Sequence, residues 1–318
     1  MLVFFVGTGR CGSTPVVEAI CRHPEVGFVS NVDDKLSYLN LSGRWNNALH
    51  RRSPPRDPRL RPFRDRRRLF ERGRVRLAPS EGWRVLDRQI SPMMSTPFRD
   101  LGASDRTPWL DRRLHEFFER RMAAQRRPVF VHHLTGWPRV GLLHAVFPQA
   151  RFVHVVRDGR AVANSWLQMG WWRGYQGPSQ WHLGPLAEPE AREWEESGRS
   201  FVALAGLGWR ILIEALERAR AAVPPAQWLE TRYEDVIAEP RAQIASVLDF
   251  MELDWTAEFE NSFTRYPFEA RRVDAFRRDL DPANLALLER TLASTLIAYG
   301  YDVALSTSGV RIVAEGGP

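Results

Sequence analysis

The sequence predicts an α/β fold in which helices cover both faces of one parallel β-sheet. Short, wholly apolar runs, such as residues 2–6 and 129–131, are typical of strands buried on both faces of such a sheet. Longer segments with apolar residues at helical spacing, at 105–127 and 200–222, predict helices that pack on it. With 318 residues, 44% of them hydrophobic, the chain has enough material for one domain over 1–318.

A glycine-rich loop and a helix follow the first predicted strand. The segment reads Gly7-Thr8-Gly9-Arg10-Cys11-Gly12-Ser13-Thr14-Pro15. A hydroxyl residue before a proline, followed by apolar residues at helical spacing, predicts that a helix begins here. The N–H groups of such a loop and the positive end of the helix dipole form an anion site that favours phosphate. The N-terminal unit is therefore predicted to bind phosphate.

The position of the cation distinguishes this loop from that of nucleoside triphosphatases. Gly7 and Gly12 have the spacing of the triphosphate-binding loop, in which a lysine directly follows the last glycine. Ser13 stands in the place of that lysine, and the basic residue is Arg10. The loop resembles the 5′-phosphosulfate loop of sulfotransferases that use 3′-phosphoadenosine 5′-phosphosulfate (PAPS). That resemblance implies binding of PAPS by Gly9, Arg10, Cys11, Gly12, Ser13 and Thr14, with Arg10 also catalytic.

A second motif lies where the strand that ends at 156 leads into a helix. Arg157 and Ser165 are eight residues apart, so they fall near one face of this segment. Arginine offers a planar fork for a phosphate, and serine offers a short hydroxyl. The pair resembles the 3′-phosphate site of the same family. The resemblance also implies Tyr233 at the adenine and Arg277 in a segment that closes over the 3′-phosphate.

The sequence leaves the general base open among four residues. Residues 31–35 are predicted to form the loop after the second strand. In the most similar sulfotransferases an acidic residue in this loop has the role of general base; here the nearest equivalent place holds Asn31, so Asp33 and Asp34 are the substitutes. The strand at 129–133 also delivers His132 and His133 to the ligand-binding edge of the sheet, where neutral imidazole can accept a proton. Strand alternation predicts that the two histidines point to opposite faces. We select Asp33 and His133 as the catalytic candidates.

Two segments are candidates for the acceptor side. Residues 43–84 are rich in arginine, proline and aspartate, and they predict a surface insertion that is either a solvated basic loop or an acceptor lid. Residues 166–200 contain many aromatic residues, which suit an acceptor wall or ordinary core. Neither segment distinguishes a small-molecule acceptor from a glycan or a lipid.

The amino-acid composition limits the kinds of partner and the cellular compartment that we expect for this protein. A net charge of +7 implies anionic partners, although arginine supplies almost all of the positive charge because Lys35 is the only lysine. The two cysteines, Cys11 and Cys21, make neither a disulfide framework nor a zinc site. No apolar run approaches the length of a membrane span. We therefore expect a cytoplasmic enzyme that is not an integral membrane protein, needs no metal and binds no nucleic acid.

These observations together predict a sulfotransferase. It would transfer a sulfonyl group from PAPS to a hydroxyl or amine of a small-molecule, glycan or lipid acceptor by in-line displacement. The chemistry parallels phosphoryl transfer, in which a protein positions the reactants and stabilises charge. A kinase or nucleoside triphosphatase with the same strand, loop and helix is one alternative. A polyanion- or nucleic-acid-binding protein, with the basic residues 51–76 as its contact surface, is another.

Overall fold

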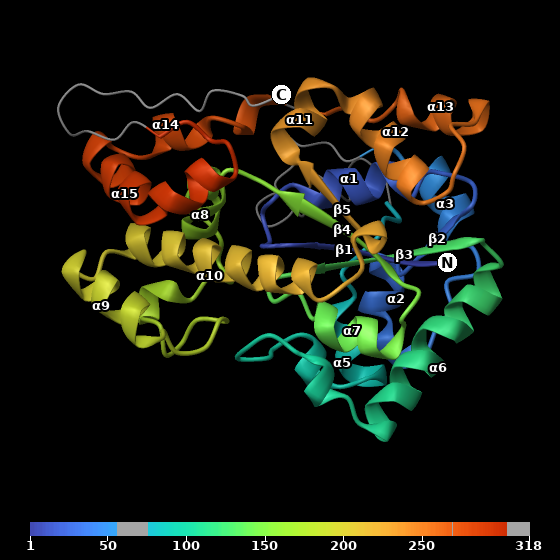
Figure 1. Cartoon of the computed structure of the whole chain (residues 1–318). Coiled ribbons are helices and arrows are strands. Elements are labelled where there is room, and N and C mark those ends of the chain that lie inside the picture. The colour runs from blue at the N-terminus through green and yellow to red at the C-terminus, as the bar shows by residue number, and fades with distance from the viewer. Residues whose placement is uncertain (56–75, 269, 304–318) are drawn as a thin grey trace.

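Five parallel strands form the single sheet of this α/β protein (Figure 1). The structure is a computed structural model that describes residues 1–55, 76–268 and 270–303. The strands are β1 (Leu2–Gly7), β2 (Val26–Phe28), β3 (Val129–Thr135), β4 (Arg151–Val156) and β5 (Trp228–Arg232), in the order β2-β3-β1-β4-β5. Every pairing between neighbours is parallel. The predicted fold is confirmed.

Residues of the central strands alternate between two cores. Phe4 and Phe152 belong to the core on one face, and Phe5 and Val153 belong to the core on the other. Because both faces are covered, successive residues of β1 are all buried, which explains the unbroken apolar run at 2–6.

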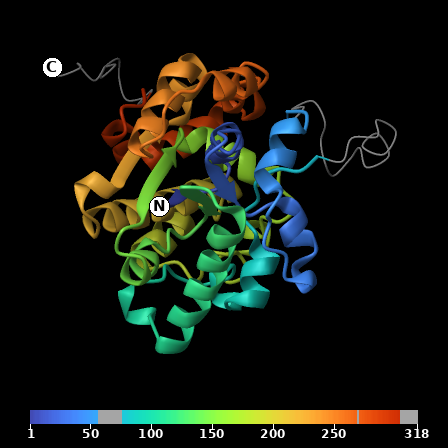
Figure 2. The same cartoon turned by 90° about the vertical axis from the view of Figure 1, so that its right-hand side faces the viewer.

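Helices cover both faces of the sheet, and Figure 2 shows green α6 on one side of the strands and orange α12 on the other. One core includes residues of α5 (Trp83–Gln89), α6 (Pro108–Gln125), α7 (Val140–Val146), α8 (Gly159–Leu167), α10 (Phe201–Ala221) and α15 (Pro282–Ala298). The other includes residues of α1 (Ser13–Ile20), α11 (Tyr233–Ala238), α12 (Pro240–Phe250) and α13 (Ala257–Phe263).

The remaining helices are short. They are α2 (Asn31–Lys35), α3 (Asn46–Arg52), α9 (Glu188–Glu196), α14 (Ala275–Asp279) and the 3₁₀ turns Ser37–Leu39, Pro92–Met94, Ala103–Asp105, Gly174–Gln176, Pro225–Gln227 and Ala270–Arg272. The two longest predicted helices, at 105–127 and 200–222, are present as α6 and α10. Each is capped at its N-terminus by a hydroxyl side chain, from Thr107 and Ser200 respectively.

The segment after β2 differs from the prediction. Residues 31–35 were expected to form a loop, whereas they form α2. The helix forms because Ser30 and Asp33 make a capping box, in which each side chain accepts the backbone N–H of the other residue.

The predicted insertion at 43–84 is only partly described, since residues 56–75 lie outside the described ranges. Its described flank contains α3, which packs against β2. The buried Asn47 side chain donates hydrogen bonds to three backbone carbonyls, those of Cys21, His23 and Val26. This flank is therefore an integral part of the fold rather than a solvated loop.

The strand order places the ligand-binding edge at the carboxyl ends of β1, β3 and β4. The chain leaves β1 toward β2 on one side, and β4 pairs with β1 on the other. Such a switch of direction opens a crevice beyond the strand ends in open α/β sheets. Among the described residues, no helix is both long and apolar enough to cross a membrane.

Candidate functional site

The glycine-rich loop has the backbone geometry of a tight anion-binding turn. Gly9, Arg10 and Gly12 have φ angles of 78°, 58° and 87°, in the left-handed region. Gly12 caps α1, and a Cβ atom there would lie 2.1 Å from the ring of Tyr233. Only glycine therefore fits this position, where the backbone turns into the N-terminus of α1 beside an aromatic ring.

Cys11 and Ser13 turn their side chains inward from the loop. The Cys11 thiol is fully buried, its Sγ lies 3.4 Å from Ser13 Oγ, and burial raises the pKa of this thiol. Ser13 Oγ is 2.8 Å from Nε2 of His133. Both residues can therefore contribute only their backbone N–H groups to a ligand above the loop without rearrangement.

Four of the predicted PAPS-binding residues contact one another. Arg10 Nε donates to Ser165 Oγ at 2.9 Å, so the loop touches α8. The Arg157 guanidinium donates to the carbonyl oxygen of Arg10 at 3.1 Å and lies 4.8 Å from the ring centre of Tyr233. Segments 150 residues apart in the sequence thus meet at one point beyond the sheet.

One donor group of the Arg157 side chain is not used in the described structure. Its Nε is buried and has no hydrogen-bond partner among the described residues. Another of its nitrogens donates to the carbonyl oxygen of Arg272 at 2.6 Å. An oxyanion could accept a hydrogen bond from Nε and could replace the Arg272 carbonyl oxygen at the other nitrogen, since charge-assisted hydrogen bonds to an anion are stronger than bonds to a neutral carbonyl.

Arg277 is not joined to this group of residues. It lies on α14 with its side chain 54% exposed, 3.9 Å from Asp274 and stacked on Phe276. The segment reaches Arg157 through the backbone of Arg272 instead. The described contacts therefore bring the 270–280 region to the site without Arg277.

The two histidines face opposite sides of the sheet, as predicted, but they lie within β3, which continues to Thr135; Thr135 and not a histidine ends the strand at the ligand-binding edge. His132 is buried among phenylalanine rings, and burial lowers its pKa to about 3. Neither of its ring nitrogens has a hydrogen-bond partner among the described residues, so it is a neutral core residue. His133 faces Ser13 instead, and burial likewise lowers its pKa.

The structure gives Asp33 and Asp34 roles other than the predicted one. Asp33 Oδ2 accepts hydrogen bonds from the N–H and hydroxyl of Ser30 and from the side-chain amide of Asn46 at 2.6–2.9 Å, and the residue is buried. Asp34 Oδ1 accepts from the first-turn N–H groups of Arg84 and Val85 in α5. Both carboxylates are occupied in holding helices.

Glu81 is the acidic residue that the sequence analysis missed. Its Oε1 accepts from Thr135 Oγ1 at 2.5 Å and its Oε2 from Trp83 Nε1 at 2.7 Å, while His133 Nε2 lies 3.9 Å away. The side chain is 29% exposed. An antiparallel bridge between Ser30 and Pro79 carries the segment to this edge of the sheet. Nothing in the local sequence marks the residue.

Aromatic rings lead from the loop toward the surface. A Cβ atom on Gly9 would point at Thr135 Oγ1, 3.7 Å away, and at Trp166 Nε1, 3.9 Å away. Trp166 is buried, and its Nε1 has no hydrogen-bond partner among the described residues. Its ring lies 6.4 Å from that of Trp171, which is 46% exposed, and 5.6 Å from that of His182. These rings belong to the aromatic segment predicted at 166–200.

A model of the Sulfotransferase family matches residues 3–257, which include the loop, Arg157, Ser165, Tyr233 and Glu81. The chain belongs to the sulfotransferase family. This membership favours the sulfotransferase hypothesis over the kinase and polyanion-binding alternatives.

Curated relatives and solved structures agree with this family. The chain is 23% identical over 191 residues to the omega-hydroxy-beta-dihydromenaquinone-9 sulfotransferase Stf3 of Mycobacterium bovis and of Mycobacterium tuberculosis. The match covers 60% of this chain and 46% of each relative, so the chain spans about half the length of these curated relatives. The fold is similar to that of sulfotransferase STF9 from Mycobacterium avium (TM-score 0.55, 16% identity, 95% of this chain and 77% of that one). It is also similar to sulfotransferase STF1 from Mycobacterium tuberculosis H37Rv (TM-score 0.50, 16% identity, 92% and 76%).

The site of this member of the sulfotransferase family has donors that suit a phosphosulfate. The loop presents backbone N–H groups at the start of α1. Two side-chain donors nearby, Arg157 Nε and Trp166 Nε1, are buried without an acceptor among the described residues. Buried donors normally have a partner, so these two are exceptions that a ligand oxygen could satisfy after a local rearrangement. Among the described residues, no group of three or more histidine, cysteine, aspartate or glutamate side chains could hold a metal ion.

Proposed function

We propose that this sulfotransferase transfers a sulfonyl group from PAPS to a hydroxyl group of a hydrophobic, lipid-like or aromatic acceptor. The observation that carries the proposal is the convergence of Arg10, Ser165, Arg157 and Tyr233 beside the glycine-rich loop. PAPS supplies the activated sulfonyl group, and the product is 3′-phosphoadenosine 5′-phosphate (PAP).

The nucleotide side of the site neutralises and orients phosphate. The loop from Gly9 to Thr14 and the start of α1 direct N–H groups at the 5′-phosphate, and Arg10 adds a full positive charge there. Arg157 and Ser165 hold the 3′-phosphate, with Arg157 exchanging the Arg272 carbonyl for a phosphate oxygen. Tyr233, already under the Arg157 guanidinium, provides a ring against which the adenine stacks.

Glu81 accepts the proton of the acceptor hydroxyl in this proposal. It is more exposed than Asp33 or His133, and it lies beside Thr135, next to the outer side of Gly9. Thr135 and Trp83 donate to its two oxygen atoms and hold the carboxylate in one orientation. His133 keeps Ser13, and hence the loop, in place through its 2.8 Å contact.

The acceptor side favours a hydrophobic molecule. The rings of Trp166, Trp171 and His182 form a wall that leads outward from Gly9, and aromatic faces bind aromatic or isoprenoid groups well. The curated relatives are named for an omega-hydroxylated dihydromenaquinone, a lipid-like acceptor of the same kind. The two buried free thiols, Cys11 and Cys21, accord with a reaction in the cytoplasm.

Calorimetric titration with PAP, alongside ATP and magnesium, tests the proposal. We expect tight binding of PAP, weak binding of ATP, and a loss of about 10- to 150-fold in PAP affinity for Arg157→Ala, because a charge-assisted contact disappears. The exposed Arg278 provides the control, and Arg278→Ala keeps full affinity. Binding of ATP without binding of PAP contradicts the proposal. Incubation with PAPS and a hydroxylated quinol then tests the acceptor class, with sulfated product as the readout.

A further inference from the structure

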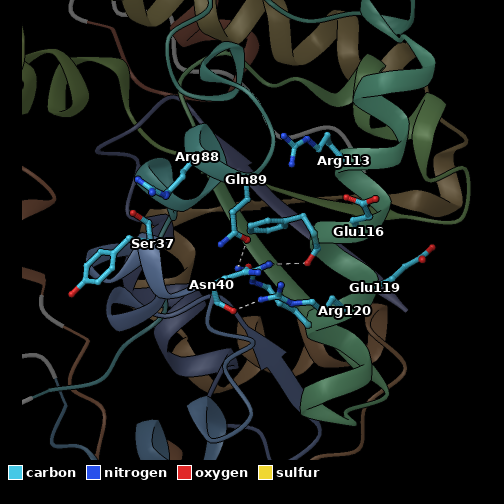
Figure 3. A pocket seen from close by; sticks show the side chains of 11 residues that line it. Ser37, Asn40, Arg88, Gln89, Arg113, Glu116, Glu119 and Arg120 are labelled. Carbon is cyan, nitrogen blue, oxygen red and sulfur yellow. Dashed lines mark hydrogen bonds between the residues drawn. The ribbon is translucent and has the colours of Figure 1, made fainter.

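A cavity of about 510 Å³ lies on a different part of the molecule from the glycine-rich loop (Figure 3). Its walls come from the segment 37–40, from the C-terminal end of α5 and from one face of α6. No residue of the loop, β4 or α8 lines it. Its volume falls in the range typical of small-molecule sites, roughly 300–1,000 Å³. The proposed PAPS site does not account for it.

The side chains around the cavity carry excess positive charge. Four arginines, Arg88, Arg113, Arg120 and Arg121, face two glutamates, Glu116 and Glu119. One of the two glutamates is already engaged, since Glu119 lies 2.7 Å from Nδ1 of His115. In Figure 3 the Arg113 side chain extends from α6 toward α5, and Arg88 lies on the α5 side of the cavity beside Ser37. The arrangement attracts anions.

Several donors at the cavity have no acceptor in the described part of the chain. The side chains of Arg88 and Arg113 make no hydrogen bond or ion pair with another described residue, and Arg113 only stacks near Trp109. Arg121, 1% exposed, donates to Gln89 Oε1 at 2.9 Å, while its own Nε and the Nε2 of Gln89 are buried with no partner in the described part of the chain. Buried donors left unpaired in this way are costly, so this wall of the cavity carries unsatisfied polar groups.

We propose that this cavity binds a phosphate or sulfate group, separately from the PAPS site. Guanidinium groups pair with such tetrahedral oxyanions through parallel N–H bonds, and here Arg88 of α5 and Arg113 of α6 both line the cavity without a hydrogen-bonding partner among the described residues. The group belongs either to a free anion or to a lipid headgroup. The helix α5 links the two sites: Glu81 precedes its start and Gln89 ends it, about 10 Å away at the helical rise per residue.

Titration of PAP-saturated protein with inorganic pyrophosphate tests the site for a free anion. Saturation with PAP keeps pyrophosphate out of the glycine-rich loop. The double variant Arg88→Ala/Arg113→Ala removes two cavity arginines without touching the buried Arg121. We expect it to bind pyrophosphate at least about tenfold more weakly than wild type, because two charge-assisted contacts are lost. Arg112→Ala is the matched control: Arg112 is exposed on α6 next to Arg113 but does not line the cavity.

A second arm distinguishes the source of the phosphate. The same proteins are sedimented with phosphatidylcholine vesicles that contain phosphatidic acid, and with vesicles of phosphatidylcholine alone. Binding to phosphatidic acid that the double variant loses and Arg112→Ala keeps assigns the cavity to a lipid headgroup. Loss confined to the pyrophosphate titration assigns it to a free anion. Equal binding by the double variant and Arg112→Ala in both arms overturns the proposal. The comparison of the double variant with Arg112→Ala in the vesicle arm does not depend on PAP, so it tests the cavity even if PAP does not bind.

Discussion

Replacing Gly12 with alanine tests the geometry of the nucleotide loop most directly. The residue has a φ of 87°, and an added Cβ would lie 2.1 Å from the Tyr233 ring. Left-handed backbone costs an L-residue about 1–2 kcal/mol. Displacing a buried ring from a filled space costs about 1–3 kcal/mol more. We therefore expect Gly12→Ala to lower the free energy of unfolding by about 2–5 kcal/mol.

Gly198→Ala separates the two costs. Gly198 also has a positive φ, of 70°, but no atom lies within 4 Å of the place its Cβ would take. Its substitution should cost only the backbone part, about 1–2 kcal/mol. Urea denaturation of both variants measures the difference, and calorimetry with PAP measures the effect on the site. Gly12→Ala should also lose PAP affinity, since Tyr233 and the loop N–H groups move together. Equal stability and equal PAP affinity in the two variants would refute this account of the loop.

Two further substitutions examine the acceptor side and the core. Glu81→Gln should lower kcat by about 10²- to 10⁴-fold with little change in PAP affinity, the size expected for loss of a general base; an unchanged kcat assigns the proton transfer elsewhere. Burial keeps His132 neutral and lowers its pKa to about 3 in the folded protein, whereas its pKa in the unfolded chain is near 6.5. As the pH falls from 6.5 toward 3, the unfolded chain binds a proton that the folded protein does not, so the free energy of unfolding decreases. Between pH 7 and pH 5 the free energy of unfolding, measured by denaturant titration, should fall by about 2 kcal/mol less in His132→Phe than in wild type. An equal fall in both proteins shows that His132 does not titrate on unfolding.

The elements that local chemistry dictates could be predicted from the sequence. The central strands are apolar on both faces, and the loop combines glycines with a cation and two hydroxyl residues. Each of these patterns lies within one short segment, so the sequence alone predicts the strands and the loop. The capping role of Asp33 could also have been predicted. Ser30 stands three residues before it, which is the spacing of a capping box, and that signal competes with a catalytic role for the same carboxylate.

The position of Glu81 could not be predicted because long-range pairing sets it. Glu81 reaches the end of β3 only through the bridge between Ser30 and Pro79 and through its bond from Thr135, more than 50 residues away. No spacing rule within the segment 76–84 indicates that contact. The contrast between His132 and His133 was predictable in direction, because strand alternation sets it. The burial of His132 among phenylalanines was not predictable, because it depends on how α6 packs on the sheet.

Asp34, which follows β2, contributes to the proposed site indirectly, through the start of α5. Asp34 accepts the N–H groups of Arg84 and Val85 and so fixes the start of α5, directly after Glu81. Asp34 is therefore a positioning residue for the proposed base. We expect Asp34→Ala to lower kcat by roughly tenfold with unchanged PAP affinity, since a small misplacement of a catalytic group is costly.

Asp34→Asn separates positioning from charge. The asparagine side chain keeps an oxygen atom that can accept the same two N–H groups, so it should restore most of kcat. Steady-state kinetics with PAPS and a fixed acceptor, at a pH where all three proteins are folded, provide the measurement. If Asp34→Asn is as slow as Asp34→Ala, the carboxylate acts through its charge and not through the helix. If neither variant is slower than wild type, the start of α5 does not control Glu81.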